Sequence, residues 1–152
     1  MSTRTIFLVA LIAFILSPTL TAQPQAPWFG TWKLNFEKSA GSSGVRYKRV
    51  VLKIGPWEDG LKVTYDYVGV RGGVTHMEWT GRFDGKDYAV QGLDYVLTNA
   101  YALTGDRGYR IVVKADGAVA ATATVVISPD GKTLTSVTSG ENGTTTSVYD
   151  KM

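Results

Sequence analysis

From Trp28 onward, apolar and polar residues alternate in short runs that are separated by glycine-containing turns. The clearest example is residues 61–67, where Leu61, Val63, Tyr65 and Tyr67 alternate with Lys62, Thr64 and Asp66. A period of two is typical of a β-strand with one buried face. The turns recur at intervals of roughly 8–12 residues, which favours a sandwich or a barrel.

The pattern predicts ten short strands, at residues 29–37, 45–55, 61–70, 74–83, 86–91, 95–104, 107–115, 118–128, 132–139 and 144–151. The alanine-rich start of the eighth is read as strand because β-branched residues continue it. Asp84-Gly85, Asp116-Gly117 and Asn142-Gly143 suit tight hairpins between antiparallel neighbours. We therefore expect an all-β fold: one antiparallel up-and-down barrel of about 8–10 strands, with the first strand paired to the last.

The N-terminal region has the pattern of a signal peptide. Arg4 precedes an apolar run at residues 6–16, which is too short to span a membrane, and small residues follow up to Ala22. We expect cleavage after residue 22, a proline-rich leader at 23–27 and a barrel domain at 28–152. The expected location is the periplasm or the extracellular space, with no stable membrane span after cleavage.

The amino-acid composition excludes several classes of function. The chain has no cysteine, which excludes disulfides, thiolate catalysis and cysteine-bound metal centres. The formal net charge is +3, with a local basic group at Arg46, Lys48, Arg49 and Lys53. A charged edge strand explains this group better than a nucleic-acid groove, so we expect no nucleic-acid partner. The oligomeric state is left open.

Three segments carry a resemblance to a known group of proteins. Gly30-Thr31-Trp32-Lys33-Leu34 resembles the Gly-x-Trp first strand of the calycins, which include lipocalins and fatty-acid-binding proteins, and Val148-Tyr149-Asp150-Lys151 resembles their last strand. With residues 75–88 and 128–135, the chain is most similar to small secreted bacterial lipocalin-like proteins. The resemblance implies a barrel with a cavity, with Gly30 and Trp32 in structural roles and Trp32 packed across the barrel floor.

The chain departs from the fatty-acid-binding pattern at two places. Only residues 38–44 stand where the two-helix lid would be. That family holds the fatty-acid carboxylate partly with an Arg-x-Tyr in the last strand. Here the same place reads Ser147-Val148-Tyr149, so Tyr149 matches and the arginine is absent.

One predicted strand carries an unusual polar set. His76, Glu78, Thr80 and Arg82 share one face, and Met77, Trp79 and Phe83 share the other. If the polar set lines a cavity, Arg82 could receive an anionic ligand head and His76 could tune its binding with pH. If the apolar set packs the core, the polar set lies in solvent, which avoids the cost of burying Glu78 and Arg82.

Tyrosines are the second candidate lining, since they combine an apolar body with a polar tip. We expect an exported protein that holds a small apolar or amphipathic molecule inside the barrel, with no catalytic residues, cofactor or metal. The candidate ligand-binding residues are His76, Glu78, Arg82, Tyr65, Tyr67, Tyr101 and Tyr149. The alternatives are a cavity-free barrel that acts through its surface, and an enzyme that uses His76 and Glu78.

Overall fold

The computed structural model describes residues 25–41 and 47–152. The predicted signal peptide at 1–22, the first part of the leader and the start of the second predicted strand lie outside the described residues. The strands are β1 (Gly30–Leu34), β2 (Tyr47–Trp57), β3 (Gly60–Gly69), β4 (Val74–Gly81), β5 (Tyr88–Gln91), β6 (Leu97–Gly105), β7 (Gly108–Ala115), β8 (Ala118–Ile127), β9 (Thr133–Gly140) and β10 (Gly143–Lys151).

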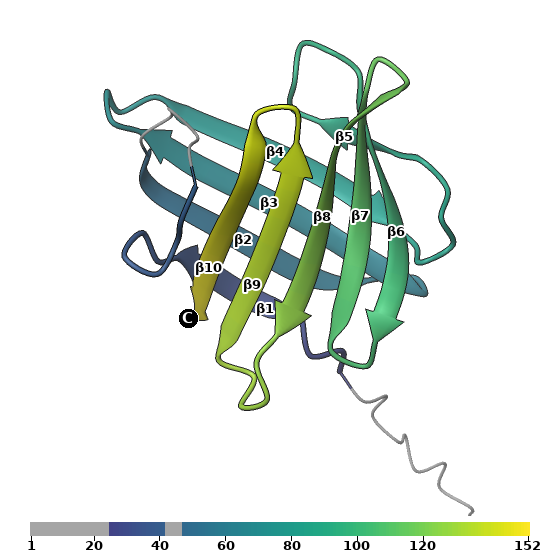
Figure 1. The fold of residues 1–152 in the computed structure, drawn as a ribbon, viewed down its shortest axis with the longest axis horizontal. Helices are drawn as coiled ribbons and strands as arrows, with labels where there is room; N and C mark the ends of the chain where they lie inside the picture. Colours follow the sequence, from purple (N-terminus) through teal and green to yellow (C-terminus); the bar gives the residue numbers. More distant parts are fainter. Residues whose placement is uncertain (1–24, 42–46) are drawn as a thin grey trace, which may run out of the picture.

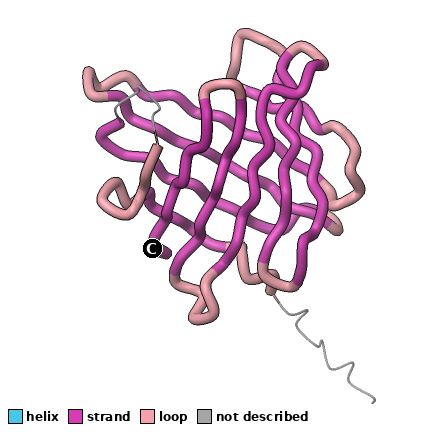
Figure 2. Tube along the Cα trace, viewed as in Figure 1, coloured by secondary structure: helices cyan, strands magenta, loops and turns pink. Residues whose placement is uncertain are grey.

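The ten strands form one closed antiparallel barrel in which each strand pairs with its neighbours in the chain. β1 closes the ring by pairing with β10, where Trp32 lies opposite Lys151 and Leu34 opposite Tyr149. In Figure 1, β6 to β10 form the front wall and cross β2 to β4 behind them at a steep angle. The predicted all-β up-and-down barrel is confirmed, and Figure 2 shows only strands and loops in the described part of the chain.

Tight hairpins explain why the order in space follows the order in sequence. Between β7 and β8, Asp116 and Gly117 both have positive φ, at 49° and 84°. Those angles match the twist of the flanking strands, and glycine adopts them without steric cost. No helix within the described residues is long and apolar enough to cross a membrane.

An aromatic cluster closes one end of the barrel. Trp28 packs against Phe83 and Tyr109, with ring centroids 5.4 and 5.3 Å apart, and Tyr101 lies 5.9 Å from Tyr109. Trp32 is fully buried beside them, and its indole Nε1 donates a hydrogen bond of 3.0 Å to the Trp28 carbonyl. These rings exclude water from the floor of the barrel.

Three large apolar side chains lie partly outside the core. Phe36, Tyr95 and Leu103 are each about half exposed. Phe36 lies beyond the end of β1, Tyr95 lies in the loop before β6, and Leu103 lies in the last part of β6, where residues 102–105 are all exposed.

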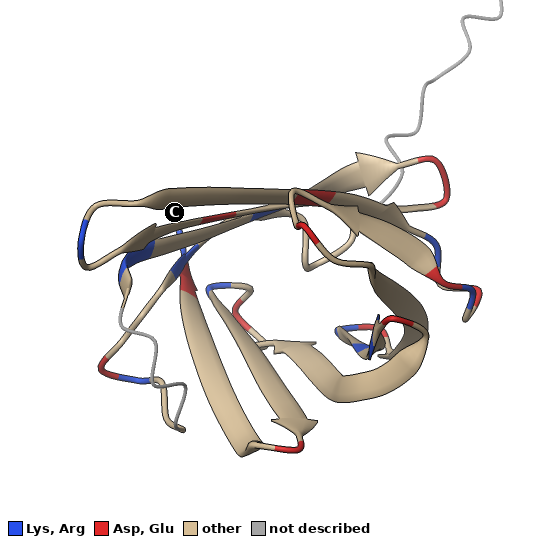
Figure 3. Cartoon of the chain, turned by 90° about the horizontal axis from the view of Figure 1, so that it is seen from above, with Lys and Arg blue, Asp and Glu red and all other residues tan. Residues whose placement is uncertain are grey.

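Lys48, Arg49 and Lys53 of the basic group lie on β2, which is not an edge strand, and Arg46 lies outside the described residues. β2 pairs with β3 along its length and with β1 at residues 51–54. Lys53 therefore lies between two paired strands, whereas Lys48 and Arg49 precede the part of β2 that pairs with β1. Figure 3 shows Lys and Arg positions interspersed with Asp and Glu positions around the barrel.

Replacing Trp32 by alanine tests the importance of the floor. Trp32→Ala is expected to lower the free energy of unfolding by about 3–5 kcal/mol, because it removes a fully buried indole and leaves a void. Urea unfolding followed by circular dichroism would measure the loss. Val74→Ala, at a position 71% exposed, is the control and should change stability by less than about 0.5 kcal/mol. An unchanged midpoint for Trp32→Ala would contradict its role in the core.

Candidate functional site

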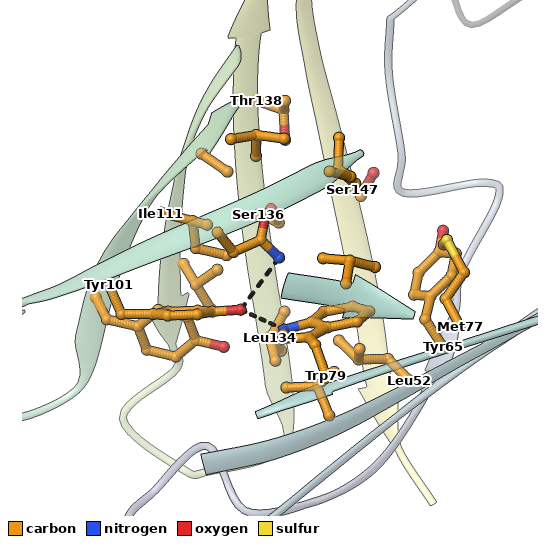
Figure 4. Close-up of a pocket in the computed structure, with 18 of the residues that line it drawn as sticks. Leu52, Tyr65, Met77, Trp79, Tyr101, Ile111, Leu134, Ser136, Thr138 and Ser147 are labelled. Atoms are coloured by element: carbon orange, nitrogen blue, oxygen red, sulfur yellow. Dashed lines mark hydrogen bonds between the residues drawn. The ribbon is translucent and has the colours of Figure 1, made fainter. Parts of the chain in front are cut away.

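The barrel interior is not completely filled. A cavity of about 290 Å³ lies inside it, above the aromatic floor. Its wall is mostly apolar and comes from strands all around the barrel, with Leu52, Val63, Met77, Val90, Ile111, Val125 and Leu134 among the lining residues. Figure 4 shows several of these side chains converging on the cavity. A volume near the lower limit of known ligand pockets is enough for one small molecule.

The deepest polar group of the wall is centred on Tyr101. Its hydroxyl accepts hydrogen bonds from Trp79 Nε1 and from Asn99 Nδ2, the latter at 3.3 Å, and both are drawn as dashed lines in Figure 4. Asn99 is only 6% exposed, and its Oδ1 has no hydrogen-bond partner among the described residues. The cavity therefore offers a fixed polar site within an otherwise apolar wall.

Gly81 makes room for this arrangement. A Cβ at Gly81 would lie 2.7 Å from two ring carbons of Tyr101, which is closer than real Cβ contacts allow. The absence of a side chain at the end of β4 lets the Tyr101 ring approach the backbone of that strand closely. Any larger residue at position 81 would push the Tyr101 hydroxyl away from Trp79.

A second polar group consists of hydroxyls on the opposite part of the wall. Ser136 and Ser147 face each other across β9 and β10, and Thr138 also lines the cavity. Tyr65 and Tyr149 complete the group. Burial is the largest cause that raises the pKa of each of these two tyrosines, so both stay neutral at physiological pH.

This second polar group lies between the interior cavity and another hollow of the barrel. A second hollow, of about 480 Å³, shares Tyr65 and Ser147 with the interior cavity and also includes Leu34, Phe36 and Tyr47. Tyr67 packs edge-on against Tyr47 and Tyr65 near this opening. Among the predicted ligand-binding tyrosines, Tyr65, Tyr101 and Tyr149 line the cavity, whereas Tyr67 does not.

His76, Glu78 and Arg82 were candidate ligand-binding residues on the condition that they line a cavity, and none of the three is among the residues that line it. His76 Nδ1 lies 2.5 Å from Asp66 Oδ1 and Glu78 Oε1 lies 2.8 Å from Lys62 Nζ, both on the outer face of β3 and β4.

Arg82 pairs with Glu58 and Asp59 and lies over the Trp57 ring, 5.3 Å from its centroid. Strand alternation turns Met77 and Trp79 inward, so the alternative with the polar set in solvent is the one observed.

Several lining residues were not predicted from the sequence. Trp79 was assigned to the apolar face of its strand without a role in the site. Asn99 shares the inward face of β6 with Tyr101, two residues apart, and this spacing was the available signal. Ser136 and Thr138 gave no signal, since short hydroxyl residues occur on both faces of β9.

Metal-binding geometry is absent from the described part of the chain. Within residues 25–41 and 47–152, no three His, Asp or Glu side chains converge in a way that could hold a metal ion.

No family model and no curated protein sequence matches this chain. Solved structures with the same fold do match. A fatty-acid-binding protein 1 from Echinococcus granulosus has a TM-score of 0.59 at 14% identity, over 83% of this chain and 98% of that one. A mutant of the fluorescent protein UnaG has a TM-score of 0.58 at 15% identity, over 83% and 96%. A fatty acid transporter, REP1-NXSQ, has a TM-score of 0.57 at 11% identity, over 82% and 95%.

The fold is that of the ten-stranded fatty-acid-binding-protein-like barrels. At these identities the likeness concerns the arrangement of the strands and not the residues of the site.

Removing one hydroxyl tests the Tyr101 group. Tyr101→Phe is expected to destabilise the fold by about 1–3 kcal/mol, because the Trp79 indole N–H loses its acceptor in an apolar environment. Urea unfolding would measure the loss. Tyr95→Phe removes a hydroxyl from a half-exposed ring and serves as the matched control. Equal stability of the two variants would show that the Trp79–Tyr101 contact contributes nothing.

The buried tyrosines predict a loss of stability at high pH. Burial is the largest cause that raises the pKa of Tyr65, Tyr101, Tyr109 and Tyr149, whereas tyrosine in an unfolded chain ionises near pH 10. Their contribution to folding is therefore fully present below about pH 10 and is lost as the pH rises further. Each tyrosine should steepen that loss by about 1.4 kcal/mol per pH unit.

Phenolate absorbance, recorded together with circular dichroism, would check this expectation. These four tyrosines, of which three are buried and Tyr65 is half-buried, should ionise only when the barrel unfolds. Their reversible ionisation near pH 10 in the folded protein would show that solvent reaches the barrel interior freely.

Proposed function

We propose that this protein is an exported binding protein that holds one small apolar or amphipathic molecule inside its barrel. The observation that carries the proposal is the interior cavity of about 290 Å³, with an apolar wall and a few fixed polar groups. Burial of apolar ligand surface in such a wall supplies the affinity, and the polar groups set the orientation.

Two of the similar structures support the proposal through what they are named for. They are a fatty-acid-binding protein and a fatty acid transporter, and both share the barrel architecture. The cavity also favours binding over the alternative of a completely filled barrel that acts only through its surface.

An enzymatic function has less support. The enzyme alternative relied on His76 and Glu78, and both lie on the outer surface in ion pairs with Asp66 and Lys62. None of the three similar structures is named as an enzyme. We therefore favour a non-catalytic role.

Export is the remaining part of the proposal. The charged start, the short apolar run at residues 6–16 and the small residues before position 23 support a cleaved signal peptide. Sequencing the N-terminus of the protein recovered from culture medium or periplasm would test this expectation directly. A chain that keeps residues 1–22 would contradict it.

Binding is tested first by native mass spectrometry of the purified protein, followed by organic extraction. We expect a stoichiometric small molecule, or uptake of the neutral apolar dye N-phenylnaphthylamine with increased fluorescence. A protein that carries no ligand and takes up no dye would contradict the proposal.

A pair of variants locates the binding site. Ala123 lines the cavity, whereas Ala120 of the same strand is exposed. Ala123→Phe is expected to fill the cavity and weaken dye binding at least about tenfold, while Ala120→Phe binds as the parent does. Equal binding by the two variants would place the ligand outside the barrel.

A further inference from the structure

The cavity wall contains no charged side chain among the residues that line it. Its polar atoms belong to Asn99, to the Trp79 indole, and to the hydroxyls of serine, threonine and tyrosine. The tyrosines do not change this at physiological pH, because burial raises the pKa of Tyr101 and Tyr109 as well as that of Tyr65 and Tyr149. The wall is therefore neutral over the whole physiological pH range.

The neutrality follows from the way charges are distributed over the strands. On β3 and β4 the charged positions fall between the inward ones and pair across the outer face, as Lys62 does with Glu78. On β7, Lys114 reaches Asp87 at 2.8 Å outside the barrel, while Ile111 and Val113 line the cavity. None of the described lysines and arginines is among the residues that line the cavity.

A neutral wall discriminates between ligands by their charge. A carboxylate that leaves water loses its hydration, and this loss is compensated only where a cation or several hydrogen-bond donors receive it. In the last strand the inward residues Ser147 and Tyr149 supply hydroxyls and no cation. Among the residues that line the cavity, the buried side-chain atom without a partner is the acceptor Asn99 Oδ1, which does not favour an anion.

The same groups suit an uncharged hydroxyl. The Tyr101 oxygen already accepts from Trp79 and Asn99, so its own proton is free to be donated to a ligand oxygen. A ligand hydroxyl can accept from Tyr101 and donate to the vacant Asn99 Oδ1, since it is both a donor and an acceptor.

We propose, building on the binding function above, that the cavity selects neutral amphiphiles that carry a hydroxyl group and discriminates against fatty-acid anions. The hydroxyl contacts Tyr101 and Asn99 at the inner end of the cavity, and the apolar part lies along apolar wall residues such as Leu52, Ile111 and Val125. The volume of about 290 Å³ corresponds to about ten water molecules, so a chain of about ten carbons fits.

The first experiment compares two ligands that differ only at the head group. Decanol and decanoate would compete with N-phenylnaphthylamine for the purified protein at about pH 7.5, where decanoate is ionised. Decanol is expected to displace the dye at a concentration at least about tenfold lower than decanoate.

The outcomes separate the inference from the function on which it rests. Displacement by decanoate at an equal or lower concentration overturns the neutral-ligand inference and leaves the binding function standing. Failure of the dye, decanol and decanoate to bind at all overturns both.

A variant that adds a cation tests the cause of the discrimination. Ser147→Arg places a guanidinium at a cavity-lining position, and Thr144→Arg places the same charge at an exposed position of the same strand. Ser147→Arg is expected to lower the ratio of the decanoate to the decanol concentration needed to displace the dye by about tenfold or more. Thr144→Arg is expected to leave this ratio unchanged. An unchanged preference in folded Ser147→Arg would overturn the inference.

Tyr101→Phe provides a second test that adds no charge to the barrel. It should weaken decanol binding by about 3–10-fold more than it weakens dye binding, the difference expected for one hydrogen bond. Loss of decanol and dye binding in equal proportion would mean that Tyr101 only supports the fold, which would overturn its assignment to the hydroxyl.

Discussion

The pairing of β1 with β10 is the contact on which the rest of the barrel depends. β1 has only five residues, yet it joins the two ends of the sheet by pairing with β2 on one side and β10 on the other. Without it, β2 and β10 would both expose unpaired N–H and C=O groups. Trp32 lies in this short strand with its ring fully buried, so closure of the ring and packing of the floor are formed by the same residues.

Closure also explains why a cavity persists. Ten tilted strands enclose a wider space than eight, and side chains of ordinary size do not fill it completely. The aromatic rings of Trp28, Phe83 and Tyr109 fill one end. Further along the axis the inward positions carry smaller residues, such as Ala123, Ser136 and Ser147, and the empty volume lies there.

The barrel and its strands could be predicted from the sequence because alternation and turn chemistry are local signals. The face of β4 that points into the barrel could not be predicted, because alternation defines two faces of a strand without showing which one is buried. The solvation of Glu78 and the partners available on β3 decide the matter, and those partners are set by strand register. The role of Asn99 could not be predicted for a different reason. A polar residue between Leu97 and Tyr101 interrupts the apolar face of its strand, and only the folded structure shows that its amide donates a hydrogen bond to the Tyr101 hydroxyl.

The neutral interior and the charged exterior have one origin. In a closed sheet every strand contributes about half of its side chains to a single enclosed space, so an ionised group on an inward position would lose most of its hydration. Surface ion pairs such as His76–Asp66 and Lys62–Glu78 cost little where they are, because water still reaches them. A site that must receive an anion therefore needs an inward cation built in at a cost to folding, and no described lining residue of this barrel provides one.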